Sequence, residues 1–261
     1  MTSTPPRLLA IAGHDPTGGA GIQADIETAL AFGVHPTTVV TCLTAQDSRD
    51  VHALYPQEPE AFRHQLEVVV RDLEPDAIKI GLIGSEALVP AIVEIGDRLG
   101  APVVVDPILK ASGGAELASG VLIETLRREL LPKATLATPN LEEARRLTGR
   151  VRPEACAAEL LQLGCRAVLI TGGDGEGGEV VDRLWTEEGE WCFWGERLGE
   201  GAHGSGCTLS SACAALLAKG VPLVEAVGRA ISWTREAIAR GWRPSQGQRF
   251  PRRIRPLSAN S

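Results

Sequence analysis

Short apolar runs alternate with amphipathic segments along most of this chain. Mostly apolar runs of four to six residues predict buried strands at residues 8–12, 39–44, 77–80, 102–106, 135–138 and 167–171. Apolar positions at helical spacing predict helices at residues 21–32, 58–73, 85–99, 120–131 and 154–163, and another from Leu141. Apolar strands separated by helices are typical of a parallel sheet covered on both faces. We therefore expect an α/β fold, a three-layer α/β/α sandwich with a mainly parallel sheet.

The last third of the chain departs from this alternation. Residues 180–186 and 191–194 flank a polar turn at residues 187–190, which predicts a hairpin at the edge of the sheet. Two further helices are predicted at residues 205–219 and 223–240. Because no linker-like stretch or internal repeat divides the sequence, we expect one domain over residues 1–261, with a core of about residues 8–240 and a tail of residues 241–261.

The composition excludes several classes of protein. The chain has 261 residues, of which 44% are hydrophobic, enough for a core that a disordered chain lacks. A net charge of −7 disfavours binding to the phosphate backbone of nucleic acid. Six cysteines form no C-x-x-C pair, and the N-terminal sequence has no apolar stretch long enough for a signal peptide or membrane span. We therefore expect a cytoplasmic protein that binds neither nucleic acid nor membranes.

Polar and Gly-rich segments lie at the ends of predicted strands, where open parallel sheets bind ligands. These segments are residues 13–21, Asp106-Pro107, residues 138–143, 171–178 and 201–208. Each has a purely structural interpretation: a tight turn, a loop cap, a flexible loop or, at Asn140 and Glu143, a helix N-cap. Together they favour a site with an acceptor molecule on one side and a nucleoside triphosphate on the other.

The segment 201–208 is the strongest of these signals because it leads directly into a predicted apolar helix. Free backbone amides at a helix N-terminus stabilise a transferring phosphoryl group, whose charge spreads over three oxygens. A thiol in this turn is expected to have a lowered pKa, which favours a catalytic role for Cys207. The alternative is that Cys207 is a small buried apolar residue.

In combination, the motifs resemble the hydroxymethylpyrimidine/phosphomethylpyrimidine kinases of thiamine biosynthesis, members of the ribokinase-like superfamily. The resemblance covers about residues 8–238 and is carried by AGHDPTGGAGIQAD (residues 12–25), LTAQD (43–47), KIGL (79–82), VDPI (105–108), TPN (138–140) and HGSGCT (203–208). It implies that ATP phosphorylates the hydroxymethyl group of 4-amino-5-hydroxymethyl-2-methylpyrimidine and then the resulting monophosphate. It also implies Mg²⁺ as a cofactor and a homodimer.

The resemblance assigns residues to each part of the site. It implies a pyrimidine pocket lined by Gly13, Asp25, Gln46, Leu82, Ile108 and Cys207. Gln46 offers a donor and an acceptor to an aminopyrimidine, and Asp25 accepts from a substrate hydroxyl or amine. The nucleotide contacts it implies are Asp106, Asn140, Thr171, Gly173, Ser205 and Thr208. Asp106 and Glu143, directly or through water, match positions associated with Mg²⁺, which prefers oxygen ligands.

The resemblance also implies where catalysis takes place. Most members of the superfamily have an Asp as base where this chain has Cys207, and a thiolate there is a candidate to take the substrate proton. A loose phosphoryl-transfer transition state needs little help from a base. We therefore expect the amides of Gly204, Gly206 and Cys207 to contribute more than the thiol does.

Several positions depart from the family pattern. Many relatives have a lysine where this chain has Thr171, so the expected lysine contact to phosphate is missing. Leu82 stands where Met is common, a near-isosteric exchange. The tail contains four arginines, at positions 249, 252, 253 and 255, which are most simply a solvated end. The alternative is that one of them replaces the missing lysine near the triphosphate.

Three other functions compete with this interpretation. A pyridoxal or pyridoxine kinase of the same superfamily acts on a similar planar heterocycle with a hydroxymethyl group. A non-catalytic ligand-binding or regulatory relative would keep the pocket, although the intact turn at residues 204–207 argues against it. A Rossmann oxidoreductase is disfavoured because the first Gly-rich turn has the wrong spacing and no acidic ribose partner is evident.

Overall fold

Nine strands form one sheet in the computed structural model, which describes residues 4–172, 178–199, 201–244 and 247–254. The strand order is β3-β2-β1-β4-β5-β6-β7-β8-β9. The strands are β1 (Arg7–His14), β2 (His35–Gln46), β3 (Val51–Pro56), β4 (Ala77–Ile80), β5 (Val103–Val105), β6 (Leu136–Ala137), β7 (Ala167–Ile170), β8 (Glu179–Thr186) and β9 (Gly189–Glu196). All pairs from β2 to β7 are parallel, whereas β3, β8 and β9 pair antiparallel at the two edges.

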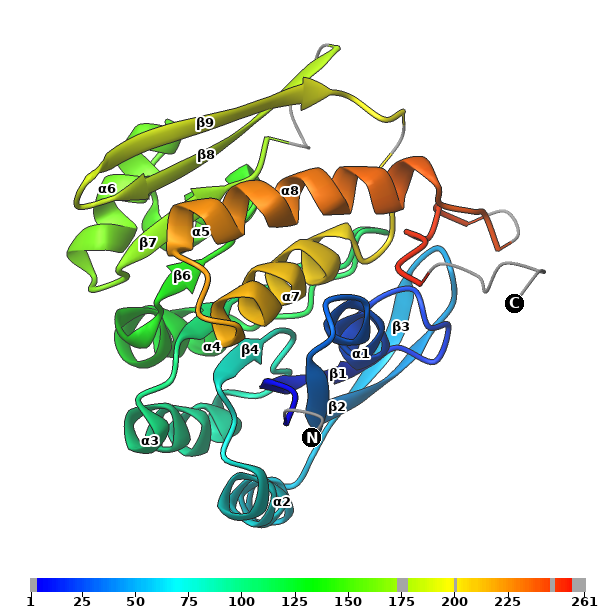
Figure 1. The fold of residues 1–261 in the computed structure, drawn as a ribbon. Helices are drawn as coiled ribbons and strands as arrows, with labels where there is room; N and C mark the ends of the chain where they lie inside the picture. The colour runs from blue at the N-terminus through cyan, green and yellow to red at the C-terminus, as the bar shows by residue number, and fades with distance from the viewer. Residues whose placement is uncertain (1–3, 173–177, 200, 245–246, 255–261) are drawn as a thin grey trace.

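Helices cover both faces of this sheet (Figure 1). The helical elements are α1 (Gly21–Ala31), α2 (Pro59–Leu73), η1 (Glu86–Leu88), α3 (Val89–Leu99), α4 (Gly120–Thr125), η2 (Leu126–Leu130), η3 (Leu131–Lys133), α5 (Leu141–Thr148), α6 (Pro153–Gln162), α7 (Ser205–Ala218) and α8 (Leu223–Ala239). One buried cluster packs α2 to α6 against the sheet, and a second packs α1, α7 and α8 against the opposite face. The predicted three-layer α/β/α sandwich with a mainly parallel sheet is therefore confirmed.

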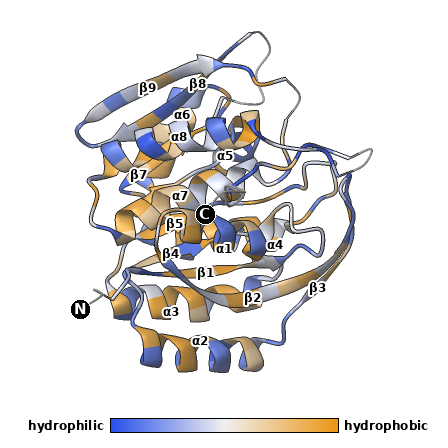
Figure 2. Ribbon diagram, turned by 45° about the vertical axis from the view of Figure 1, so that its right-hand side comes forward, coloured by the Kyte–Doolittle hydropathy of each residue, from blue (hydrophilic) through white to orange (hydrophobic). Residues whose placement is uncertain are grey.

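Burial follows the hydrophobic pattern that predicted these elements. Strand β1 and helix α7 are coloured mostly as hydrophobic in Figure 2, whereas α2 alternates between hydrophobic and hydrophilic residues. Helix α2 buries Phe62, Leu66 and Val70, and α7 buries ten residues in a row from Cys207 to Leu216. Because α7 is packed on all sides, its first turn is fixed firmly at the carboxyl edge of the sheet.

The structure differs from the predicted elements at three places. Strand β3 was not predicted, because it is an edge strand with no fully buried residue and so lacks an apolar run. The helix predicted at residues 85–99 begins with the 3₁₀ turn η1 at Ser85, which caps the amide of Ala87. The helix predicted at residues 120–131 changes into the π turn η2 and the 3₁₀ turn η3 near Pro132. The predicted edge hairpin is present as β8 and β9.

The prediction that the arginines of the tail form a solvated end is wrong for Arg253, whose side chain is buried with Phe250. The segment after α8 folds back on the domain through a bridge between Trp242 and Phe250 and another between Ala202 and Arg249. Burial of an arginine requires partners for its charge, and these come from distant parts of the chain. Arg255 lies outside the described residues. No helix in the part of the chain that the structure describes is long and apolar enough to cross a membrane.

Candidate active site

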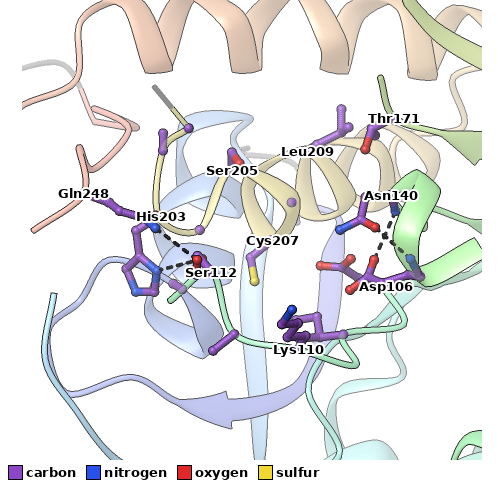
Figure 3. Close-up of a pocket in the computed structure, with 18 of the residues that line it drawn as sticks. Asp106, Lys110, Ser112, Asn140, Thr171, His203, Ser205, Cys207, Leu209 and Gln248 are labelled. Atoms are coloured by element: carbon purple, nitrogen blue, oxygen red, sulfur yellow. Dashed lines mark hydrogen bonds between the residues drawn. The ribbon is translucent and has the colours of Figure 1, made fainter. Parts of the chain in front are cut away.

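A cavity of about 690 Å³ lies at the carboxyl ends of the parallel strands. This volume is typical of sites for small molecules and cofactors. Figure 3 shows side chains from the loops after β5 and β6 and from the start of α7 turned toward one another around it. The predicted site residues that line the cavity are Gly13, Gln46, Leu82, Asp106, Ile108, Asn140, Glu143, Thr171, Gly204, Ser205, Gly206 and Cys207.

The structure does not bring every predicted residue to this cavity. Asp25 and Thr208 are fully buried and do not line it. Gly173 lies outside the described residues. The prediction that Asp25 offers its carboxylate to the substrate does not fit its position, since both carboxylate oxygens already have partners inside the protein.

The turn that begins α7 presents its backbone to the cavity, and glycine at position 204 makes this possible. Gly204 has a φ of +74°, and a Cβ there would lie 2.1 Å from the carbonyl oxygen of Gly19. The first helical hydrogen bond runs from the amide of Thr208 to the Gly204 carbonyl, at 2.9 Å. The amides of Gly206 and Cys207 precede this bond, so they lack intrahelical acceptors and lie where the helix dipole favours an anion.

The surroundings of Cys207 favour the neutral thiol. Burial, together with the carboxylates of Asp106 and Asp25, raises the pKa of Cys207 to about 12. The ammonium of Lys79 and the amide of Gly21 act in the opposite direction without reversing the shift. The expectation of a lowered thiol pKa is therefore wrong, because burial and the neighbouring carboxylates outweigh the groups that favour the thiolate.

Asp106 lies beside Cys207 at the end of β5. Burial raises the pKa of Asp106 to about 6, although Lys79 and a hydrogen bond from Cys207 oppose the shift. Ser210 donates to the Asp106 carboxylate at 3.2 Å. A Cβ at Gly206 would lie 3.8 Å from both carboxylate oxygens, so the carboxylate faces the backbone of the α7 turn.

Beneath these groups lies a buried ion pair that the sequence analysis did not assign. The Nζ of Lys79 lies 2.8 and 3.0 Å from the two carboxylate oxygens of Asp25, and both side chains are fully buried. Ser211 donates to Asp25 at 2.6 Å. Burial alone would lower the pKa of Lys79, but the charge of Asp25 and the hydrogen bond to it, with a smaller contribution from Asp106, outweigh burial and leave that pKa raised. A lysine inside the otherwise apolar β4 run was the signal for this pair.

Gln46, His203 and Asp15 form a second polar group on the acceptor side. Gln46 Oε1 accepts from the hydroxyl of Thr44 at 3.0 Å, and its Nε2 lies 3.4 Å from Nε2 of His203. The same His203 nitrogen lies 2.8 Å from the carboxylate of Asp15, which joins the first Gly-rich loop to the loop before α7. Burial raises the pKa of Asp15, but hydrogen bonds from His203 and Thr17 outweigh it, so that pKa is lowered.

On the nucleotide side, Asn140 and Glu143 form the capping box that the structural interpretation predicted. Asn140 Oδ1 accepts from the Glu143 amide at 2.8 Å, and Glu143 Oε2 accepts from the Asn140 amide at 3.0 Å. The other carboxylate oxygen of Glu143 accepts from the Leu109 amide at 3.3 Å. Thr171 pairs with Asn140 through an isolated parallel bridge, which brings it to the same wall of the cavity.

Lys110, which the sequence analysis did not single out, also lines the cavity. It lies on the loop after β5, and Figure 3 shows its side chain turned into the cavity below Cys207. Its Nζ lies 3.6 Å from Glu142, and both side chains are substantially exposed. The loose pairing leaves the ammonium accessible to an anion in the cavity.

The donor set fits a magnesium ion held mainly by its substrate. The described residues contain no group of three or more His, Cys, Asp or Glu side chains arranged as a metal site. The carboxylates of Asp106 and Glu143 nevertheless reach the cavity. Mg²⁺ is usually bound by one or two carboxylates together with phosphate oxygens and waters, so these two residues suit it.

Comparison with known proteins identifies the family. The family described as Phosphomethylpyrimidine kinase matches residues 15–251. The chain is 42% identical to the hydroxymethylpyrimidine/phosphomethylpyrimidine kinase of Streptomyces coelicolor, over 92% of this chain and 91% of the relative. It is 41% identical to the protein of the same name from Escherichia coli, over 88% of this chain and 90% of the relative.

Two solved structures are similar to this chain over most of its length. Phosphomethylpyrimidine kinase from Clostridium difficile superimposes with a TM-score of 0.78 at 35% identity, covering 89% of this chain and 99% of its own. An ADP complex of Bacillus subtilis pyridoxal kinase superimposes with a TM-score of 0.87 at 29% identity, covering 96% and 98%. The family match and the two bacterial relatives each cover most of this chain. The chain therefore belongs to the phosphomethylpyrimidine kinase family.

Proposed function

We propose that this chain is an ATP-dependent kinase of thiamine biosynthesis that phosphorylates 4-amino-5-hydroxymethyl-2-methylpyrimidine and then its monophosphate. The observation that carries the proposal is one shared cavity lined by Gln46, Asn140 and Thr171. In Figure 3, His203, the neighbour of Gln46, lies on one side of the start of α7, and Asn140 and Thr171 lie on the other. Such an arrangement suits transfer of a phosphoryl group from a nucleotide to an aromatic alcohol. The chain's relatives of 40–42% identity carry the corresponding name.

The acceptor binds, in this proposal, against Gly13, Leu82 and Ile108, with its amino group at Gln46. Thr44 donates to Gln46 Oε1, and this contact fixes the amide so that its acceptor and donor point in defined directions. Leu82 and Ile108 supply the apolar contacts to the ring. Asp25 acts from below as the counter-ion of Lys79 and not as a substrate contact.

Transfer takes place at the start of α7, where the amides of Gly204, Gly206 and Cys207 stabilise the charge that spreads over the phosphoryl oxygens. A neutral, buried Cys207 thiol does not act as a strong base. The substrate proton leaves late in a loose transition state, so the lack of a strong base is tolerable. Asp106 and Glu143 hold Mg²⁺, directly or through water, and the ion neutralises the phosphate charge when it is bound.

Lys110 takes over the phosphate contact that the family places at the position of Thr171. Lys110 is the one lysine among the described residues that line the cavity. Its Nζ lies 3.6 Å from the Glu142 carboxylate, and both side chains remain exposed. Arg235, which also lines the cavity, is instead fixed by Asp182 at 2.9 Å and by backbone carbonyls. A charge that is loosely held is better able to move to a phosphate than one enclosed in a network.

The family resemblance also bears on the organisation of the protein. We propose that the whole chain works as a single domain, which one continuous sheet supports. A homodimer is supported by the cross-strand neighbours Leu43 and Tyr55, which leave two large apolar side chains exposed on the β2–β3 ribbon. Six unpaired cysteines support a reducing compartment such as the cytoplasm.

A pyridoxal kinase is the second candidate. Pyridoxal kinase from Staphylococcus aureus in complex with pyridoxal superimposes with a TM-score of 0.89 at 28% identity. The deciding experiment is a coupled ATP assay with hydroxymethylpyrimidine, its monophosphate and pyridoxal in parallel. We expect the pyrimidine alcohol and its monophosphate to be used with the higher kcat/KM. Transfer to pyridoxal alone would overturn the assignment, and loss of the second step alone would limit the enzyme to the first.

A further inference from the structure

The C-terminal strap, defined here as residues 247–253, contains an arginine that lies directly behind the catalytic turn. Arg253 is 4% exposed, although it is within nine residues of the end of the chain. The strap is anchored by a hydrogen bond from the Arg252 amide to the carbonyl of Ala237 in α8, at 2.9 Å. Burying a guanidinium is costly unless its donors are paired, so its partners indicate what it holds together.

The guanidinium of Arg253 joins three separate elements. Its Nε donates to the hydroxyl of Thr208 in the first turn of α7, at 2.8 Å. One terminal nitrogen pairs with Glu27 of α1 at 3.1 Å, and the other donates to the carbonyl oxygen of Gly19 in the first Gly-rich loop. Only arginine has a rigid planar fork that can reach partners in three directions at once.

Two of these partners, Gly19 and Thr208, lie against Gly204. A Cβ at this position would lie 2.9 Å from the guanidinium and 2.1 Å from the Gly19 carbonyl. Thr208, which Arg253 holds from one side, donates its hydroxyl to the Gly204 carbonyl at 2.7 Å. The backbone whose amides face the cavity is thus clamped from behind by one side chain.

The rest of the strap contacts the loops on the acceptor side. The carbonyl of Arg249 accepts from the His203 amide at 2.9 Å, and the ring of Phe250 lies 5.5 Å from the His203 ring. Gln248 donates from its amide to the carbonyl of Ser48 at 3.1 Å and from its side chain to the carbonyl of Ser112 at 3.3 Å. In Figure 3, Gln248 and His203 both reach Ser112.

We propose that Arg253 is a positioning residue for phosphoryl transfer. It fixes the amides of residues 204–207 against the first Gly-rich loop, so that they face the transferring phosphoryl group before it arrives. The inference rests on the proposed kinase function. Arg253 does not line the cavity, which separates this role from the earlier suggestion that a tail arginine replaces the lysine at the triphosphate. Positioned donors act without reorganisation, so losing their support lowers turnover more than it lowers substrate binding.

The test compares Arg253→Ala with Arg252→Ala, which removes the exposed neighbouring arginine. We expect Arg253→Ala to lower kcat by about 10–100-fold while KM for hydroxymethylpyrimidine changes by less than about threefold. Arg252→Ala should match the wild type. Added guanidinium ion at millimolar concentration should restore part of kcat in Arg253→Ala, a response that loss of stability alone does not produce.

A second variant keeps the test decisive if Arg253→Ala folds poorly. Thr208→Val removes the acceptor for Arg253 Nε with little change in shape, and we expect it to lower kcat in the same direction by a smaller factor. Unchanged kcat in both variants, or a loss of kcat that guanidinium leaves unrestored in folded Arg253→Ala, would overturn the proposal. Failure of the wild type to phosphorylate hydroxymethylpyrimidine would instead contradict the proposed function, independently of Arg253.

Discussion

The buried layer beneath the cavity, called the floor here, and the rim of the cavity hold charge in opposite ways. On the floor, Lys79 and Asp25 are fully buried and their charged atoms lie 2.8 Å apart. On the rim, Lys110 and Glu142 are 37% and 59% exposed, and their charged atoms lie 3.6 Å apart. A buried pair cannot separate without a large cost, whereas an exposed pair exchanges partners freely. The comparison indicates that the floor is permanent structure and that the rim is available to the phosphates of a substrate.

The largest effect should come from breaking the floor pair. Lys79→Met leaves the Asp25 carboxylate buried, with the Ser211 hydroxyl as its remaining hydrogen-bond partner among the described side chains. We expect unfolding in urea to show a loss of about 3–5 kcal/mol, the usual cost of removing one member of a buried pair. The double change Lys79→Met with Asp25→Leu should recover much of this loss, because no charge is then left unpaired.

Lys133→Met is the matched control for this experiment. Lys133 also has an acidic partner, Asp97 at 2.8 Å, but its side chain is 43% exposed. The free energy of unfolding of Lys133→Met should differ from that of the wild type by no more than about 0.5 kcal/mol. A similar small change in Lys79→Met would contradict the distinction between floor and rim.

Asp106 extends the floor toward the reacting atoms, and it should make stability depend on pH. Burial raises the pKa of Asp106 to about 6, above the roughly 3.9 expected for an unfolded Asp. Between these values the folded state binds the proton that the unfolded chain releases. Protonation of Asp106 therefore contributes up to about 3 kcal/mol to the free energy of unfolding below about pH 4, and this contribution is lost as the pH rises through 6.

The check is the pH dependence of the free energy of unfolding in the wild type and in Asp106→Asn. The difference between the two proteins should change most between pH 4 and 6, with the wild type losing stability relative to the variant as the pH rises. A constant difference across this range would mean that Asp106 is ionised throughout.

Cys207 tests whether the floor supplies a base. Since burial keeps the thiol neutral, Cys207→Ala should lower kcat by about tenfold, below the 10²–10⁴-fold contribution typical of a general base, with KM for the pyrimidine largely unchanged. Cys207→Ser should retain more activity because it can still donate to Asp106. Unchanged turnover in Cys207→Ala would remove any role for this side chain, and a loss above a thousandfold would restore the base.

How much the sequence could predict depends on the range of the interactions involved. The apolar runs predicted strands β1, β2, β4, β5, β6 and β7, because a strand that is buried on both faces consists mostly of consecutive apolar residues. The polar turn between two short segments predicted the edge hairpin. Strand β3 has a half-exposed pattern and left no comparable signal. The first Gly-rich loop and the turn before α7 were located by composition alone, since close backbone approach requires glycine at positions such as 204.

What the sequence could not predict was set by contacts between distant residues. The pKa of Cys207 depends on Lys79, Asp106 and Asp25, which come from three other segments. Arg253 looked like part of a solvated tail because its partners Thr208 and Glu27 lie 45 and 226 positions away. Asn140 and Glu143 are close in sequence, and their capping box was accordingly foreseen.

The smallest expected effect concerns the rim. Lys110→Met should leave the free energy of unfolding within about 0.5 kcal/mol of the wild type, because the pair with Glu142 is exposed. If Lys110 replaces the missing lysine at Thr171, KM for ATP or for the pyrimidine monophosphate should rise about three- to tenfold, while KM for the uncharged pyrimidine alcohol stays the same. Steady-state assays of both steps measure this, with Lys133→Met again as control. If Lys110→Met and the wild type have the same KM for every phosphate-bearing substrate, the ammonium of Lys110 pairs only with Glu142. The rim would then have a purely structural role, as the floor does.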